Sequence, residues 1–139
     1  MSTTSTSTPG VPTTQPACEI TGPWNLELHL SGGFAGVERR LELDQSGAYE
    51  ARDERSGRSA EGLVPADVLD EILGELPSLC SAPPQARPPT CADCFLYLLQ
   101  GTINGTRIEM VFNDLNLAEH PAGALVGTLA GFLTRALGG

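Results

Sequence analysis

The chain contains no lysine, and this absence removes several kinds of chemistry. All 8 basic residues are arginine, and 17 Asp and Glu bring the formal net charge to −9 over 139 residues. Schiff-base catalysis and lysine nucleophiles are therefore excluded. An acidic surface also repels phosphate backbones, so we expect no nucleic-acid partner.

Histidine and long apolar runs are scarce as well. The two histidines, His29 and His120, have no metal-binding spacing and no local nucleophile. We predict that they lie on the surface or cap a helix, and that the protein has no metal, no cofactor and no enzymatic activity. No apolar run reaches the roughly 18 residues of a membrane span.

The first residues are almost entirely Ser, Thr, Pro and Gly. Such a segment buries too little apolar area to offset the entropy of ordering it, so we predict a disordered linker over residues 1–18 and one folded domain over residues 19–139. Linkers of this kind often follow a bacterial membrane anchor. We therefore expect a bacterial, extracytoplasmic protein, secreted or lipid-anchored, whose anchor is missing from this chain.

Four cysteines favour disulfides over metal binding or redox chemistry: Cys18, Cys80, Cys91 and Cys94. The Cys91–Cys94 CxxC motif precedes a predicted strand and not a helix, which disfavours a redox-active dithiol. A zinc site needs a second pair at matching spacing. A bond from Cys80 to Cys91 or Cys94 would close the proline-rich loop and leave the other cysteine for Cys18, but sequence does not fix the pairing.

The stretch from Trp24 to Asp44 organises the rest of the chain. Two runs of alternating apolar and polar residues flank a glycine-rich segment; the apolar positions are Leu26, Leu28 and Leu30, then Val37, Leu41 and Leu43. Alternation of this kind predicts strands with one buried face. The segment Ser31–Gly36 has three glycines around Phe34 and predicts an irregular hairpin tip.

The remaining elements follow from similar signals. We predict strands over Ala48–Asp53, Phe95–Ile103 and Thr106–Phe112, a loop or ragged strand end over Arg55–Gly62, and loops over Leu79–Pro89 and Asn113–Glu119. Helices are predicted over Pro65–Leu76, ended by Pro77, and over Pro121–Leu137. The order β-β-β-α-β-β-α favours an α+β domain, an antiparallel sheet of about five strands with two helices packed on one face.

From Leu26 to Leu137 the chain resembles the emfourin family of small bacterial proteins. The likeness rests on the tip Ser31–Gly36 followed by a strand with Arg39 and Arg40, on the Cys91–Cys94 motif before an aromatic strand, and on Asn113–Asp114 after the second hairpin. The resemblance implies a non-enzymatic inhibitor of thermolysin-like (M4) metalloproteases. The partner-binding residues it implies are Ser31, Gly32, Gly33, Phe34, Ala35 and Gly36, with Asp114 as an addition that approaches the zinc of the protease.

Two other interpretations stay open at this point. Apolar rings tend to be buried, so the Phe34 ring can fold back onto its own sheet. Alternatively, it is an anchor for a partner, because loops on rigid strands often carry binding. At the level of function, the alternative is an extracytoplasmic lipoprotein domain with a structural or ligand-binding role and no protease partner.

Overall fold

A central strand, β1 (Trp24–Gly32), carries the alternation predicted from the sequence. In the computed structural model, which describes residues 19–80 and 87–138, its apolar residues Trp24, Leu26, Leu28 and Leu30 are all buried. The strand pairs with β2 (Val37–Asp44) on one side and with β5 (Phe95–Ile103) on the other, antiparallel in both cases. Both halves of the chain therefore meet on β1.

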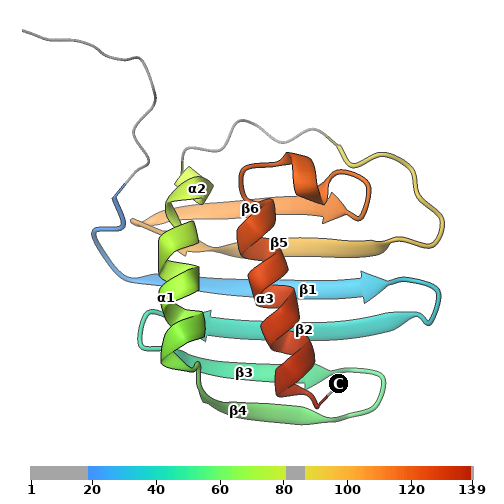
Figure 1. The fold of residues 1–139 in the computed structure, drawn as a ribbon, viewed down its shortest axis with the longest axis horizontal. Helices are drawn as coiled ribbons and strands as arrows, with labels where there is room; N and C mark the ends of the chain where they lie inside the picture. Colours follow the sequence, from blue (N-terminus) through green and yellow to red (C-terminus); the bar gives the residue numbers. More distant parts are fainter. Residues whose placement is uncertain (1–18, 81–86, 139) are drawn as a thin grey trace, which may run out of the picture.

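The sheet has six antiparallel strands in the order β4-β3-β2-β1-β5-β6. The remaining strands are β3 (Ala48–Asp53), β4 (Ser59–Leu63) and β6 (Thr106–Asn113). Two helices, α1 (Ala66–Glu75) and α3 (Gly123–Ala136), lie against the same face of this sheet (Figure 1). The predicted α+β class is confirmed, with six strands in place of about five.

The additional strand is β4, where the sequence predicts a loop or ragged strand end. Four of its five residues are exposed, so it lacks the apolar alternation that marks a half-buried strand. It forms by pairing with β3 in register, Arg52 opposite Ser59 and Ala48 opposite Leu63. A strand at a sheet edge that is held mainly by main-chain hydrogen bonds requires no particular side chains, so the sequence gives little sign of it.

The helices cover a core built mainly from leucine. Its fully buried large side chains are Phe112, Leu26, Leu28, Leu41, Ile72, Leu76, Leu99, Leu125, Leu129, Leu133 and Val126. Pro77 ends α1 as predicted, but it also begins a short helix, α2 (Pro77–Cys80), which buries Leu79. Likewise, the predicted loop over Asn113–Glu119 contains a 3-10 turn, η1 (Leu117–Glu119).

The chain enters the sheet beside the turn between β5 and β6. Asn104 adopts a positive φ of 53° in this turn. Its side chain accepts a hydrogen bond from the Thr21 N–H at 2.8 Å and donates one to the Glu19 carbonyl at 2.6 Å. The predicted linker, residues 1–18, lies outside the described residues and stays a prediction. No described helix is long and apolar enough to cross a membrane.

Candidate functional site

The β1–β2 tip presents one aromatic ring to solvent. Phe34 is 94% exposed, the largest value among the exposed large apolar residues of the described chain. The Gly36 N–H donates to the Gly33 carbonyl at 3.2 Å, which closes a turn with Phe34 and Ala35 at its corner. Gly32, Gly33 and Gly36 all have positive φ, between 69° and 88°. These are backbone angles that glycine adopts without steric cost.

The tip is packed on the segment that leads into β5. The Gly33 N–H donates to the Cys94 carbonyl at 3.1 Å. A Cβ atom at Gly33 would lie 2.6 Å from the Phe95 ring, so any side chain here would have to displace that ring. On the other side, the Arg55 guanidinium donates to the Gly36 carbonyl. The exposed ring therefore stands on a backbone that is fixed from two directions.

Arg55 is positioned by the turn between β3 and β4. Asp53, the last residue of β3, is buried, and its carboxylate accepts hydrogen bonds from the Arg55 N–H at 2.9 Å and the Ser56 N–H at 3.1 Å in this turn. The bond from Ser56 is the first cause that lowers the pKa of Asp53, and Arg39, whose Nε lies 3.3 Å away, adds to it. No sequence pattern indicated that this turn braces the tip.

Cys91 and Cys94 form a disulfide with each other, three residues apart in sequence. The suggested bonds from Cys80 to Cys91 or Cys94 are therefore wrong, because both partners are already used. Cys80 is also disulfide-bonded. Cys18 lies outside the described residues. The sequence left the pairing open and suggested a bond that closes the proline-rich loop, whereas the loop geometry brings together the two ends of the CxxC motif.

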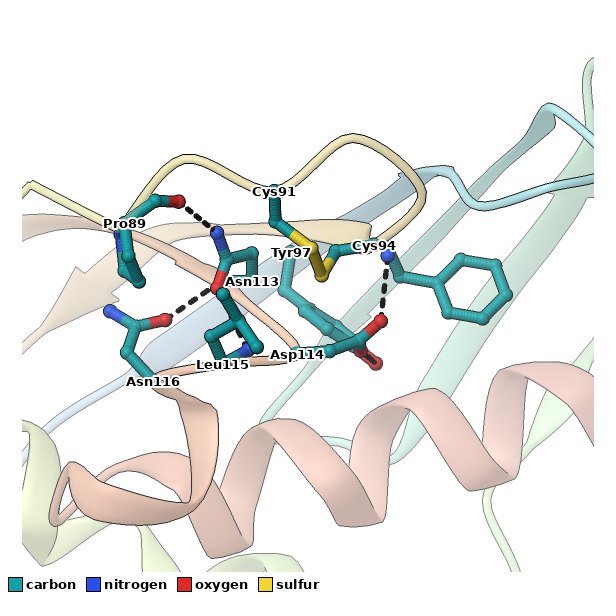
Figure 2. Close-up of a disulfide and its surroundings, with 9 residues drawn as sticks. Pro89, Cys91, Cys94, Tyr97, Asn113, Asp114, Leu115 and Asn116 are labelled. Atoms are coloured by element: carbon teal, nitrogen blue, oxygen red, sulfur yellow. Dashed lines mark hydrogen bonds between the residues drawn. A yellow bond between two sulfur atoms is a disulfide. The ribbon is translucent and has the colours of Figure 1, made fainter.

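The disulfide loop is pinned at both ends by Asn113, the last residue of β6, and by Asp114, which follows it (Figure 2). The Asp114 carboxylate accepts hydrogen bonds from the Phe95 N–H at 2.9 Å and from the Tyr97 hydroxyl at 2.8 Å. The buried Asn113 donates from Nδ2 to the Pro89 carbonyl at 2.6 Å. The loop before β5 is thus tied to the end of β6.

Tyr97 is the most perturbed titratable group at this end of the sheet. Burial, followed by the hydrogen bond to Asp114 and its negative charge, raises the pKa of Tyr97 to about 12. The neutral phenol is therefore the stable form at physiological pH, and it acts as a hydrogen-bond donor to Asp114.

Apolar surface surrounds the tip. Three of the five exposed large apolar residues belong to this end of the sheet: Phe34, Leu96 and Leu115. A groove of about 360 Å³ lies between the sheet and α3, lined by Leu30, Val37, Arg39, Phe95, Tyr97, Ala130, Gly131 and Thr134. We define the tip end as Ser31–Gly36 with this groove, the Cys91–Cys94 loop and Asp114. Phe95 and Tyr97, which line the groove, were not predicted as site residues, and neither was Arg55, which braces the tip.

Neither histidine belongs to the tip end: His29 lies on β1, and His120 makes a structural hydrogen bond before α3. His29 Nε2 lies 3.3 Å from a Glu27 carboxylate oxygen on β1. His120 Nδ1 accepts a hydrogen bond from the Ala122 N–H at 3.0 Å, just before α3, and its burial lowers its pKa. In the described ranges, no group of three or more His, Cys, Asp and Glu is arranged to hold a metal ion.

The sheet face opposite the helices carries a row of glutamates. Glu27 lies opposite Glu42, Glu42 opposite Glu50, and Glu50 opposite Glu61, on four adjacent strands. Arg40 lies 3.5 Å from Glu27, and Arg52 lies 3.3 Å from Glu50. This face is charged and solvated, in contrast with the apolar tip end.

No known protein-family model matches the chain, and no curated protein sequence shows significant similarity to it.

Proposed function

We propose that the chain is a non-enzymatic protein-binding domain that inhibits a thermolysin-like metalloprotease through its glycine-rich tip. The observation that carries the proposal is the position of Phe34, 94% exposed at the corner of a fixed turn. The alternative in which this ring folds onto its own sheet does not describe the structure. The class of the partner comes from the resemblance of the tip to the emfourin family.

A tip of this kind suits the docking of a protein. Its backbone is fixed before binding by Cys94 and Arg55, so little conformational entropy is lost when a partner engages it. An exposed aromatic side chain is a typical anchor for an apolar pocket. The groove beside the tip adds apolar area that a partner can cover.

Asp114 takes a different role in this proposal from the one implied by the resemblance. Its two carboxylate oxygens accept hydrogen bonds from Phe95 and Tyr97 within the chain. A carboxylate engaged in this way gives up those bonds if it ligates a zinc ion. We therefore assign Asp114 to holding the tip end together, and Phe34 to contacting the protease.

The test measures peptide cleavage by a panel of thermolysin-like proteases, including that of the source organism, with increasing amounts of the purified chain. We expect inhibition that Phe34→Ala weakens by about 30-fold, the loss typical of an anchor residue. The matched control is Leu63→Ala, since Leu63 is 72% exposed on β4 at the opposite end of the sheet. No loss of rate at micromolar protein against any of the enzymes would overturn the proposal.

A second function is an extracytoplasmic domain, lipid-anchored or secreted, with a structural or ligand-binding role and no protease partner. The Cys91–Cys94 disulfide favours this location because such bonds persist in oxidising compartments. The gene upstream of this chain tests the anchored form: an apolar segment followed by a lipid-attachment cysteine supports it. Inhibition of a protease by the purified chain would contradict this second function and support the first.

A further inference from the structure

The disulfide loop and the tip share their contacts. Gly33 donates its N–H to the carbonyl of Cys94, which is itself one of the bonded cysteines. A Cβ atom at Gly32 would lie 3.0 Å from that same carbonyl oxygen. Gly33 also lies against the ring of Phe95, the residue that follows Cys94. A shift of Cys94 therefore moves the surface on which both tip glycines rest.

The loop depends on the disulfide for its shape. Its two ends are pinned to Asn113 and Asp114, through the Pro89 carbonyl and the Phe95 N–H. Between these points Ala92 and Asp93 are exposed, and the two cysteines are half-buried. The covalent bond from Cys91 to Cys94 crosses this exposed segment (Figure 2). Opening the bond removes the covalent restraint on Cys94, so the Cys94–Phe95 peptide group that accepts from Gly33 is then held from the other side by its hydrogen bond to Asp114.

We propose that Cys91–Cys94 is a thiol–disulfide exchange site for a dithiol reductant, and that its reduction loosens the tip. The consequence for partner binding rests on the function proposed above. A thiolate of the reductant attacks one cysteine sulfur, forms a mixed disulfide and releases the other cysteine, which takes up a proton. The second thiol of the reductant then attacks the other reductant sulfur, the one bonded to the cysteine in the mixed disulfide, and releases that cysteine. The reductant leaves with an internal disulfide, and two electrons and two protons remain on the cysteines.

The pair is a target of exchange and not a catalyst of it. Catalytic CxxC pairs lie at a helix N-terminus, which stabilises the attacking thiolate. Here the motif leads into β5, and no described helix begins at either cysteine. Because the closed loop is short, the bond removes little entropy from the unfolded chain, so its loss acts locally and leaves the sheet folded.

The experiment follows the tip directly. The full chain is titrated with dithiothreitol, and thiol labelling with mass spectrometry reports each cysteine separately, so that the Cys80 disulfide is monitored. Hydrogen exchange is then measured at the Gly33 amide. We expect exchange at least ten-fold faster once Cys91 and Cys94 are reduced, with the amides of β3 unchanged. Unchanged Gly33 exchange in the reduced protein would refute the proposal, and so would resistance of this pair until the whole domain unfolds.

A variant separates this bond from the other disulfide. Cys91→Ser with Cys94→Ser, purified oxidised, leaves the Cys80 disulfide intact and should show the fast Gly33 exchange without reductant. The protease assay then distinguishes the two proposals. Inhibition that falls at least ten-fold on reduction supports both. Fast Gly33 exchange with no inhibition in either state supports the exchange site alone, whereas equal inhibition in both states refutes its link to binding.

Discussion

At Gly33 two separate constraints act on one residue. Its φ is +75°, and a Cβ atom there would lie 2.6 Å from the Phe95 ring. We expect Gly33→Ala to lower the free energy of unfolding by about 2 kcal/mol, through backbone strain and overpacking. Urea unfolding measures the change.

Gly127→Ala is the matched control for that substitution. Gly127 lies within α3, and a Cβ atom there meets nothing within 4 Å. Alanine in an open helical position should raise the free energy of unfolding by about 1 kcal/mol. Equal effects of the two substitutions would contradict the close packing of the tip on β5.

Tyr97 gives a pH-dependent signal at the same end of the molecule. Its pKa is raised to about 12, by burial and then by Asp114. A raised pKa means that the fold prefers the neutral phenol. The resulting stability is complete below the ordinary value of about 10 and is lost as the pH rises from there through about 12.

The difference in tyrosinate absorbance between the wild type and Tyr97→Phe isolates this group. We expect its midpoint near 12, and a lower midpoint in Asp114→Asn, which removes the negative charge from the hydrogen-bond partner. An unshifted midpoint near the ordinary tyrosine value in the wild-type chain would argue against the Tyr97–Asp114 bond.

Single residues could be interpreted from the sequence where one residue type is required by one backbone conformation. Three glycines around a single aromatic residue predicted an irregular tip, and their positive φ angles agree with it. The bracing by Arg55 could not be predicted in this way. An arginine in a polar loop has no feature that identifies its acceptor, and the Gly36 carbonyl is brought near only by the pairing of β2 with β3.

At the level of elements, the row of glutamates lowers the stability of the sheet. Glu42 lies directly opposite Glu27 on one neighbouring strand and Glu50 on the other. Like charges in this arrangement are destabilising. We expect Glu42→Gln to raise the free energy of unfolding by about 0.5 kcal/mol, measured by urea unfolding at low ionic strength.

Salt and position supply the controls for Glu42→Gln. The gain should shrink in 1 M salt, because screening weakens repulsion between exposed charges. Glu38→Gln should give a smaller gain, since Glu38 lies opposite Ser31 on β1. A loss of stability in Glu42→Gln would instead indicate that this carboxylate has a favourable partner.

The strands and helices that bury a regular apolar face could be predicted from the sequence. The bounds of β3 and β5 were predicted as observed, because their ends coincide with turn residues. β4 was missed because its stability comes from main-chain pairing at an edge. The length of α1 was nearly correct, but α2 was missed: Pro77 stops one helix and starts another, and only the direction of the chain in space distinguishes the two.

At the scale of the whole molecule, the order of the strands was the least predictable feature. The β1–β2 and β5–β6 hairpins are visible in the sequence, but the pairing of β1 with β5 joins segments about 70 residues apart and depends on packing over α1 and α3. This pairing is what brings the tip onto Cys94 and Phe95. The partners of the cysteines and the composition of the tip end therefore follow from a contact that local patterns do not encode.

The placement of Glu19 and Thr21 at Asn104 has a practical consequence. They lie beside the turn that follows β5, whereas Phe34 lies beyond the other end of β1, so the strand separates them by about 30 Å at its ordinary rise per residue. Gly138, in contrast, lies near Arg58 in the turn between β3 and β4, and the C-terminal end of α3 lies toward the end of the sheet where β1 turns into β2 (Figure 1). A sensor chip or bead coupled through the N-terminus should leave the aromatic ring facing the solution, while coupling through the last helix would crowd it.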